Sequence, residues 1–130
     1  MGYMTEEAKY MLRESLIPVL LGDNLRTHLL AMRIYTTCGV VSYICDTKKS
    51  LLNAFDPFSR YFPLFSSKFD GVALKSLLYA ASNADYRSLL IVCDDKLLPF
   101  VKENRELIES RFIICESASL FSSSPLSKLL

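Results

Sequence analysis

Four short apolar runs alternate with stretches of helical periodicity, and this alternation constrains the fold more than any other feature of the sequence. Each run has four to six residues and is rich in Val, Ile, Leu or aromatic residues, as expected for strands buried in a sheet. The four predicted strands are Ile17–Leu21, Val40–Cys45, Leu89–Cys93 and Phe112–Cys115. Strands that alternate with helices predict a Rossmann-like three-layer α/β domain with a mostly parallel sheet of about four strands.

Polar residues and glycines around these runs predict where the helices begin and end. Residues 4–14 have the spacing of a short amphipathic helix within the N-terminal part, 1–16. After Gly22, Asp23 is placed to cap a second helix, which Gly39 ends. The helical spacing of this second helix depends on Leu25, His28, Leu29, Met32 and Tyr35. Its inner or boundary face is expected to include His28.

The stretch 46–70 is the least regular part of the chain. Pro57, after Asp56, and Pro63, after Phe62, break any long helix. Five phenylalanines and a tyrosine argue against a disordered linker. We predict a short helix followed by an aromatic-rich connection that packs on the sheet and leaves some apolar surface for a neighbouring domain. Beyond it, Asp70 is placed to cap a helix over 72–81, and Asp94 or Asp95 a helix over 96–110.

Acidic residues follow the carboxyl ends of the predicted strands, the edge at which parallel sheets gather their functional groups. These ends carry Gly22-Asp23-Asn24, Asp46, Asp94-Asp95 and Glu116. A phosphate cradle needs glycines and free N–H groups, whereas this first turn has a single glycine. Two negative groups in a small site repel by about 1 kcal/mol or more. We therefore expect no phosphate here: Asp23 either caps the helix alone or also holds the ammonium or amide group of a polar ligand.

The order of these pieces resembles a known family. The stretches "PVLLGDNLRTHLLAMRIYTTCGVVSYICD" (18–46), "FSRYF" (58–62) and "SLLIVCDDKLLPFVKENRELIESRFIICES" (88–117) resemble the N-terminal, pre-ATP-grasp domain of ATP-grasp carboxylate–amine ligases. This group includes D-aspartate ligase-like and carbamoyl-phosphate-synthase-like proteins, and the resemblance covers most of the chain from Ile17 onward. It implies a small Rossmann-like domain that packs against an ATP-grasp module and contributes to the substrate end of the active site, without being catalytic alone.

The resemblance also implies site residues and partners. It puts Gly22, Asp23 and Asn24 in the substrate-side turn and Arg60 at the family's Ser-Arg-Tyr position. ATP and magnesium belong to the family's later domains, so this chain is expected to hold neither a cofactor nor a metal. Residues 1–130 then form one domain, with 118–130 as the start of a linker to a further domain. The expected partner is the ATP-grasp domain of the same chain, if the chain is longer, or a second copy in a homodimer.

Other interpretations of single residues stay open. Arg60, among Phe58, Tyr61 and Phe62, either binds a carboxylate by its two-pronged geometry or is a surface arginine that covers the aromatic cluster. The lone His28 is either packed or a general base. Three cysteines each end an apolar run and are followed by an acidic residue. They are either small buried core residues or, alternatively, the ligands of a thiolate metal site. The competing function is a stand-alone Rossmann-like binding or protein-interaction module.

Charge and hydropathy exclude some classes of partner. The chain has 15 basic and 14 acidic side chains without a block of like charge, which argues against a nucleic-acid or anionic-membrane surface. No apolar run approaches the roughly 20 residues that span a bilayer. The N-terminal residues 1–14 are polar and acidic, unlike a signal peptide. We expect a cytoplasmic protein.

Overall fold

The computed structural model confirms the α/β sheet and adds one strand to it. The sheet consists of β2 (Pro18–Leu21), β3 (Ser42–Asp46), β4 (Ser59–Pro63), β5 (Ser88–Val92) and β6 (Phe112–Glu116). All neighbours are parallel, in the order β4-β3-β2-β5-β6. The structure describes residues 3–13, 17–81, 88–116 and 121–122. Most of the predicted linker, 118–130, lies outside these residues.

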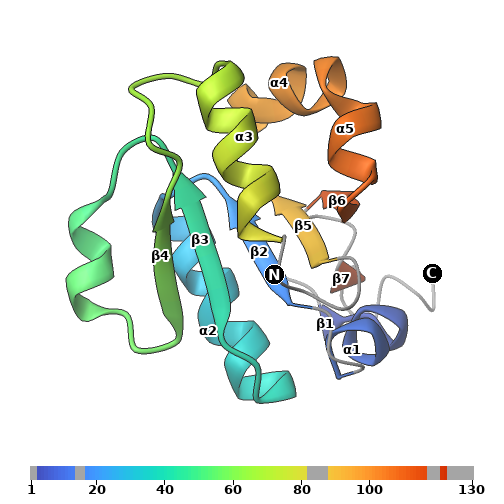
Figure 1. The fold of residues 1–130 in the computed structure, drawn as a ribbon. Coiled ribbons are helices and arrows are strands. Elements are labelled where there is room, and N and C mark those ends of the chain that lie inside the picture. The colour runs from blue at the N-terminus through green and yellow to red at the C-terminus, as the bar shows by residue number, and fades with distance from the viewer. Residues whose placement is uncertain (1–2, 14–16, 82–87, 117–120, 123–130) are drawn as a thin grey trace.

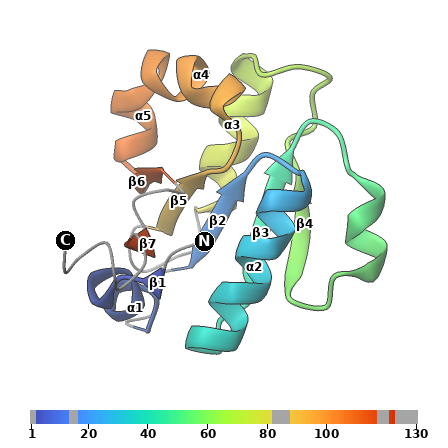
Figure 2. The same ribbon diagram turned by 180° about the vertical axis from the view of Figure 1, so that it is seen from behind.

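Helices cover both faces of this sheet, as Figures 1 and 2 show from opposite sides. One face carries α1 (Glu6–Arg13) and α2 (Leu25–Cys38), and the other carries α3 (Gly71–Ala80), α4 (Leu98–Glu103) and α5 (Arg105–Glu109). The short 3₁₀ helices are η1 (Leu51–Phe55) and η2 (Asp95–Leu97). A small antiparallel sheet pairs β1 (Tyr3–Met4) with β7 (Phe121–Ser122). Within the described residues, no helix combines the length and apolar character needed to cross a membrane.

The core forms two layers, one on each side of the sheet, because successive residues of a strand point to opposite faces. Val19 and Leu21 of β2 join the core beneath α3, α4 and α5, while Leu20 joins the core beneath α1 and α2. Every residue of β2 and β5 is buried. This double burial explains why the central strands appear in the sequence as continuous apolar runs rather than as alternating ones.

The added strand, β4, lies in the stretch that the sequence predicted as a short helix and a packed connection. The short helix is present as η1, but β4 follows it at the edge of the sheet. At the end of β4, the Leu64 N–H donates to the Asp46 carbonyl at 3.1 Å, and Pro63 is the strand partner of Asp46. Position 63 therefore faces away from β3, where the missing N–H of proline breaks no sheet hydrogen bond.

The aromatic residues of this stretch divide into packed and exposed ones. Phe58 packs against Tyr35 of α2, with ring centroids 5.2 Å apart. Tyr61 and Phe62 are partly buried against the two core layers. The prediction of packing is confirmed for these rings, while Phe55 and Phe65 are 84% and 73% exposed, so apolar surface remains beside the sheet.

Most of the predicted caps are confirmed, but the one at α2 is wrong. Asp70 caps α3 and Asp94 caps η2, while Gly39 ends α2 in the left-handed conformation. The cap of α2 is Asn24, whose side chain accepts the Thr27 N–H at 3.0 Å, and not Asp23. The single helix predicted over 96–110 is divided into η2, α4 and α5.

Most of the apolar residues that predicted α2 face solvent instead of the core. His28 is buried as expected, but the other residues of that spacing are 37–59% exposed: Leu25, Leu29, Met32 and Tyr35. The face that packs on the sheet consists of Thr27, Leu30, Ala31 and Ile34. Periodicity therefore located the helix correctly and, apart from His28, misassigned its buried face, which includes the polar Thr27 through its hydrogen bonds to Asn24.

The first turn depends on Gly22, which has a φ of 108° and lies against the next strand end. A Cβ added at this position would be 3.1 Å from the Cβ of Asp94. We expect Gly22→Ala to lower the free energy of unfolding by about 1–3 kcal/mol, because the backbone would be strained and the neighbouring carbon displaced. Urea unfolding measures this change.

The matched control is Gly71→Ala, at the start of α3, where an added Cβ meets open space. This variant should be neutral or slightly stabilising, since alanine favours helix more than glycine does. Equal losses of stability in the two variants would contradict a special role for the turn.

Candidate functional site

The turn Gly22-Asp23-Asn24 follows β2, next to β5, where the chain's progress across the sheet reverses direction. Open α/β sheets bind ligands at such a switch point. Here the turn is fixed to both neighbouring strand ends. The Gly22 N–H donates to the Cys45 carbonyl at 2.9 Å, and the Asp23 N–H donates to the Asp46 carboxylate at 2.8 Å. The Asn24 side-chain amide lies 3.5 Å from the Cys93 carbonyl.

These contacts leave the turn poorly suited to an anion. Two of its N–H groups are already bonded to β3, and the Thr27 N–H is bonded to Asn24. The Asp94 Cβ lies close to Gly22, so the backbone cannot be approached as in a glycine-rich phosphate loop. The geometry supports the expectation that this turn does not cradle a phosphate.

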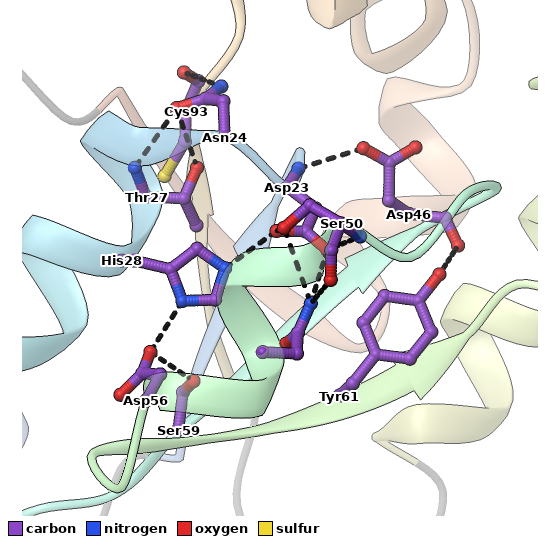
Figure 3. A network of polar contacts seen from close by, with 11 residues as sticks. Asp23, Asn24, Thr27, His28, Asp46, Ser50, Asp56, Ser59, Tyr61 and Cys93 are labelled. Carbon is purple, nitrogen blue, oxygen red and sulfur yellow. Dashed lines mark hydrogen bonds and ion pairs between the residues drawn. The ribbon is translucent and has the colours of Figure 1, made fainter.

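Asp23 is a buried acceptor within the protein. Its side chain is 0% exposed, and it makes four polar contacts; Figure 3 shows Ser50 and His28 beside it. Ser50 donates its N–H and its hydroxyl, each at 2.8 Å, and the Asn53 amide donates at 2.7 Å. The fourth contact, at 2.6 Å, is with Nε2 of His28. These bonds attach the chain beyond β3 to the first turn.

His28 lies between two buried carboxylates. Its Nδ1 is 2.5 Å from Oδ2 of Asp56, on the opposite side of the ring from Asp23. The three side chains, named here the Asp23–His28–Asp56 cluster, are 0–7% exposed. A neutral imidazole has one N–H, so both contacts are hydrogen bonds only when the ring carries two protons or one carboxyl holds a proton.

The second carboxylate, Asp56, links the cluster to the start of β4. It accepts the Phe58 N–H at 2.7 Å and the Ser59 hydroxyl at 2.6 Å. Burial alone would raise the pKa of both Asp23 and Asp56. Hydrogen bonds, led by those from Ser50 to Asp23 and from Ser59 to Asp56 and joined by His28, outweigh burial and lower both pKa values below 3.8.

This arrangement stabilises the fold and does not form a nucleophilic triad. A triad requires the base to accept a proton from the nucleophile. In this site the hydroxyls of Ser50 and Ser59 donate to carboxylates, and both nitrogens of His28 contact carboxylates. The packed state of His28 is thus the one observed.

The structure brings three of the four predicted site residues together. Gly22, Asp23 and Asn24 form the switch-point turn, whereas Arg60 is exposed on β4, three residues before the strand ends at Pro63. The distance along β4 from Arg60 to the strand end at Pro63 is about 10 Å. No sequence pattern predicts the contact of Asp56 with His28, because 28 positions separate them and no periodicity connects them.

Two of the three cysteines that end apolar runs, Cys45 and Cys93, are buried, whereas Cys115 is partly exposed. Burial raises the pKa of Cys45 and of Cys93 to about 12, so both are protonated thiols. In the part of the chain that the structure describes, no group of three or more His, Cys, Asp or Glu side chains could hold a metal ion.

Comparison of the chain with protein-family models, curated proteins and solved structures gave no significant match. The class is therefore defined by the structure itself. The sheet order and the position of the first turn make this a Rossmann-like α/β domain with its candidate site at the switch point.

Removal of His28 should be strongly destabilising. His28→Gln leaves two buried carboxylates without the ring between them, and loss of one member of a buried ionic group costs about 3–5 kcal/mol. Urea unfolding measures the loss, and adding Asp56→Asn to His28→Gln should recover part of it. The control is Glu109→Gln, in an ion pair whose side chains are 64% and 47% exposed and which should contribute little. A His28 variant as mild as this control would contradict the assignment.

The lowered pKa values predict a dependence of stability on acid. A carboxyl whose pKa is lower in the folded state stabilises the protein above its unfolded pKa, 3.8 here, and loses that contribution as the pH falls through the folded value. The free energy of unfolding should therefore decrease below about pH 4, and less steeply in Asp56→Asn than in the parent protein. Urea unfolding at a series of pH values tests this, and parallel pH profiles would contradict it.

Proposed function

We propose that this chain is the N-terminal, substrate-side domain of an ATP-grasp carboxylate–amine ligase and is not catalytic by itself. The observation that carries the proposal is the position of the resembling segments in the sheet. The segment 18–46 forms β2, α2 and β3, and the segment 88–117 includes β5 and β6. The two segments therefore flank the switch point, where ligands of open α/β sheets bind.

The chemistry of the turn favours a substrate group over a nucleotide. Acidic side chains, Asp46 and Asp94, border it, and the N–H groups of Gly22 and Asp23 bond to β3. An ammonium or amide group suits these acidic surroundings better than a phosphate does. ATP and magnesium are then assigned to another domain of the same enzyme.

The buried state of Asp23 refines its proposed role. Its side chain is fully buried while the residue as a whole is partly exposed, so the backbone of Asp23 and Asn24 is what a substrate would meet. Asp23 would shape this backbone through its bonds to Ser50 and Asn53. Arg60 remains the proposed carboxylate-binding residue, for a substrate group that extends to β4.

A stand-alone interaction module is the second candidate, on the strength of a different observation. Large apolar side chains of α2 and η1 are exposed, including Leu51 at 87% and Phe55 at 84%. Exposed apolar surface of this kind marks contact with other molecules.

The proposal predicts that the isolated chain does not bind ATP. Calorimetric titration with ATP and magnesium should give no saturable heat, because the turn lacks converging N–H donors and its edge is acidic. Saturable binding would mean that the first turn accepts phosphate, and it would contradict the assignment of ATP to another domain.

The positive test is ATP turnover by the product of the complete reading frame that contains this chain. Release of ADP that requires both a carboxylate and an amine would support the ligase, and its absence would favour the interaction module. Asn24→Ala should lower this turnover beyond its effect on the folded fraction. The control, Asp95→Asn, changes an exposed acid at the neighbouring strand end and should leave turnover intact.

A further inference from the structure

The outer face of α2 carries an unpartnered apolar stripe within the described structure. Leu25, Leu29 and Met32 follow one another at intervals of four and three residues, and each is 37–59% exposed. Tyr35 continues the stripe and is itself in contact with Phe58. At 1.5 Å per residue the stripe is about 15 Å long, or nearly three helical turns. Spacing of this kind is how two helices recognise each other.

The helix η1 extends this apolar surface. The contacts of His28 with Asp56 and of Tyr35 with Phe58 attach the chain after η1 to the side of α2. Within η1, Leu51 and Phe55 are its first and last residues and are 87% and 84% exposed, and no η1 residue is buried. We name the set Leu25, Leu29, Met32, Leu51 and Phe55 the α2–η1 surface.

The chain segment that carries the α2–η1 surface has a net positive charge. Residues 17–69 contain six Lys and Arg and three Asp, without any Glu. Each of the three carboxylates accepts hydrogen bonds inside the protein, as the site analysis shows for Asp23 and Asp56 and as Asp46 does from the Asp23 and Thr47 N–H groups. The exposed cations Arg26, Lys48 and Lys49 therefore border the surface without neighbouring free acids in this segment.

From this combination we infer that the α2–η1 surface docks an amphipathic helix of a partner protein, with apolar residues on one face and Asp or Glu on its flanks. The stripe supplies the apolar contact and the cations supply the electrostatic complement. A second copy of this chain would bring like charges together, which opposes association.

A lipid surface is the weaker alternative. Segments that bind anionic lipids typically gather about 4–8 basic residues, more than border this surface. The side chains of the stripe instead include Met and Tyr with a neighbouring Arg, the residue types enriched in protein interfaces.

Site-specific photocrosslinking in the cells that express the gene tests this inference. A photoreactive phenylalanine replaces Leu29 in one variant and Phe55 in another, with Leu107 of α5, which is 54% exposed, as the control position. Mass spectrometry then identifies the crosslinked peptide. We expect positions 29 and 55 to label one common helical segment with an acidic flank, and position 107 not to label it.

Charge reversal separates the proposed partner from adventitious contact. Arg26→Glu combined with Lys48→Glu should reduce crosslinking at position 29 by about tenfold, because acids would then face acids. Both side chains are exposed, and Glu in the first turn of α2 suits the helix dipole, so the melting temperature should not fall. Crosslinks that persist at full yield would overturn the inference, as would no crosslink or a crosslink to a second copy.

Vesicle sedimentation supplies the remaining control. The chain should bind vesicles of equimolar phosphatidylcholine and phosphatidylserine no better than phosphatidylcholine alone. Preferential sedimentation with phosphatidylserine, lost on the same charge reversal, would replace the partner helix by a membrane and overturn the inference.

Discussion

The imidazole of His28, held between two buried carboxylates, fixes the polar edge of this domain. The chain between β3 and β4 contains only η1, which buries no residue and so cannot be held in place by hydrophobic packing of its own. Its position depends on polar contacts at its two ends: Ser50 bonds to Asp23, and Asp56 contacts His28. Because the cluster is shielded from water, these contacts are stronger than the same bonds at a surface, and each leaves a costly unpaired group if it is broken.

Sequence patterns predicted β2, β3, β5 and the edge strand β6, and they missed β4 at the opposite edge. Continuous apolar runs marked β2 and β5 because no position in them faces water. The edge strand β4 has Arg60 and Pro63 among its five residues, which is the composition of a connection rather than of a core strand. Its pairing with β3 comes from tertiary contacts that a local pattern does not encode.

The candidate site was predictable only in its location. Strand alternation alone predicts that Gly22, Asp23 and Asn24 lie at the carboxyl edge of the sheet. Which of Asp23 and Asn24 caps α2 was not predictable, because both are favoured caps. The choice depends on the bonds of Asp23 to Ser50 and Asn53, which are distant in the sequence. Apart from His28, the buried face of α2 was misassigned, because hydrogen bonds made the burial of the polar Thr27 favourable.

The near-neutral charge of the whole chain hides an uneven surface. The acids of residues 17–69 are used inside the protein, so a sequence with balanced composition presents a cationic face on that half. Composition does not show this unevenness, because it counts side chains without regard to where their hydrogen bonds go.

The proline that ends β4 limits how this sheet can grow. An edge strand offers its outward N–H and C=O groups to any extended chain that approaches, which is the first step of aggregation through strand addition. Since the N–H groups of alternate residues face β3, the outward donors of β4 come from Ser59 and Tyr61, and Pro63 has none to offer. A strand of another molecule that pairs with β4 would lack a hydrogen bond at Pro63. This edge of the sheet therefore disfavours the strand addition that builds a fibre.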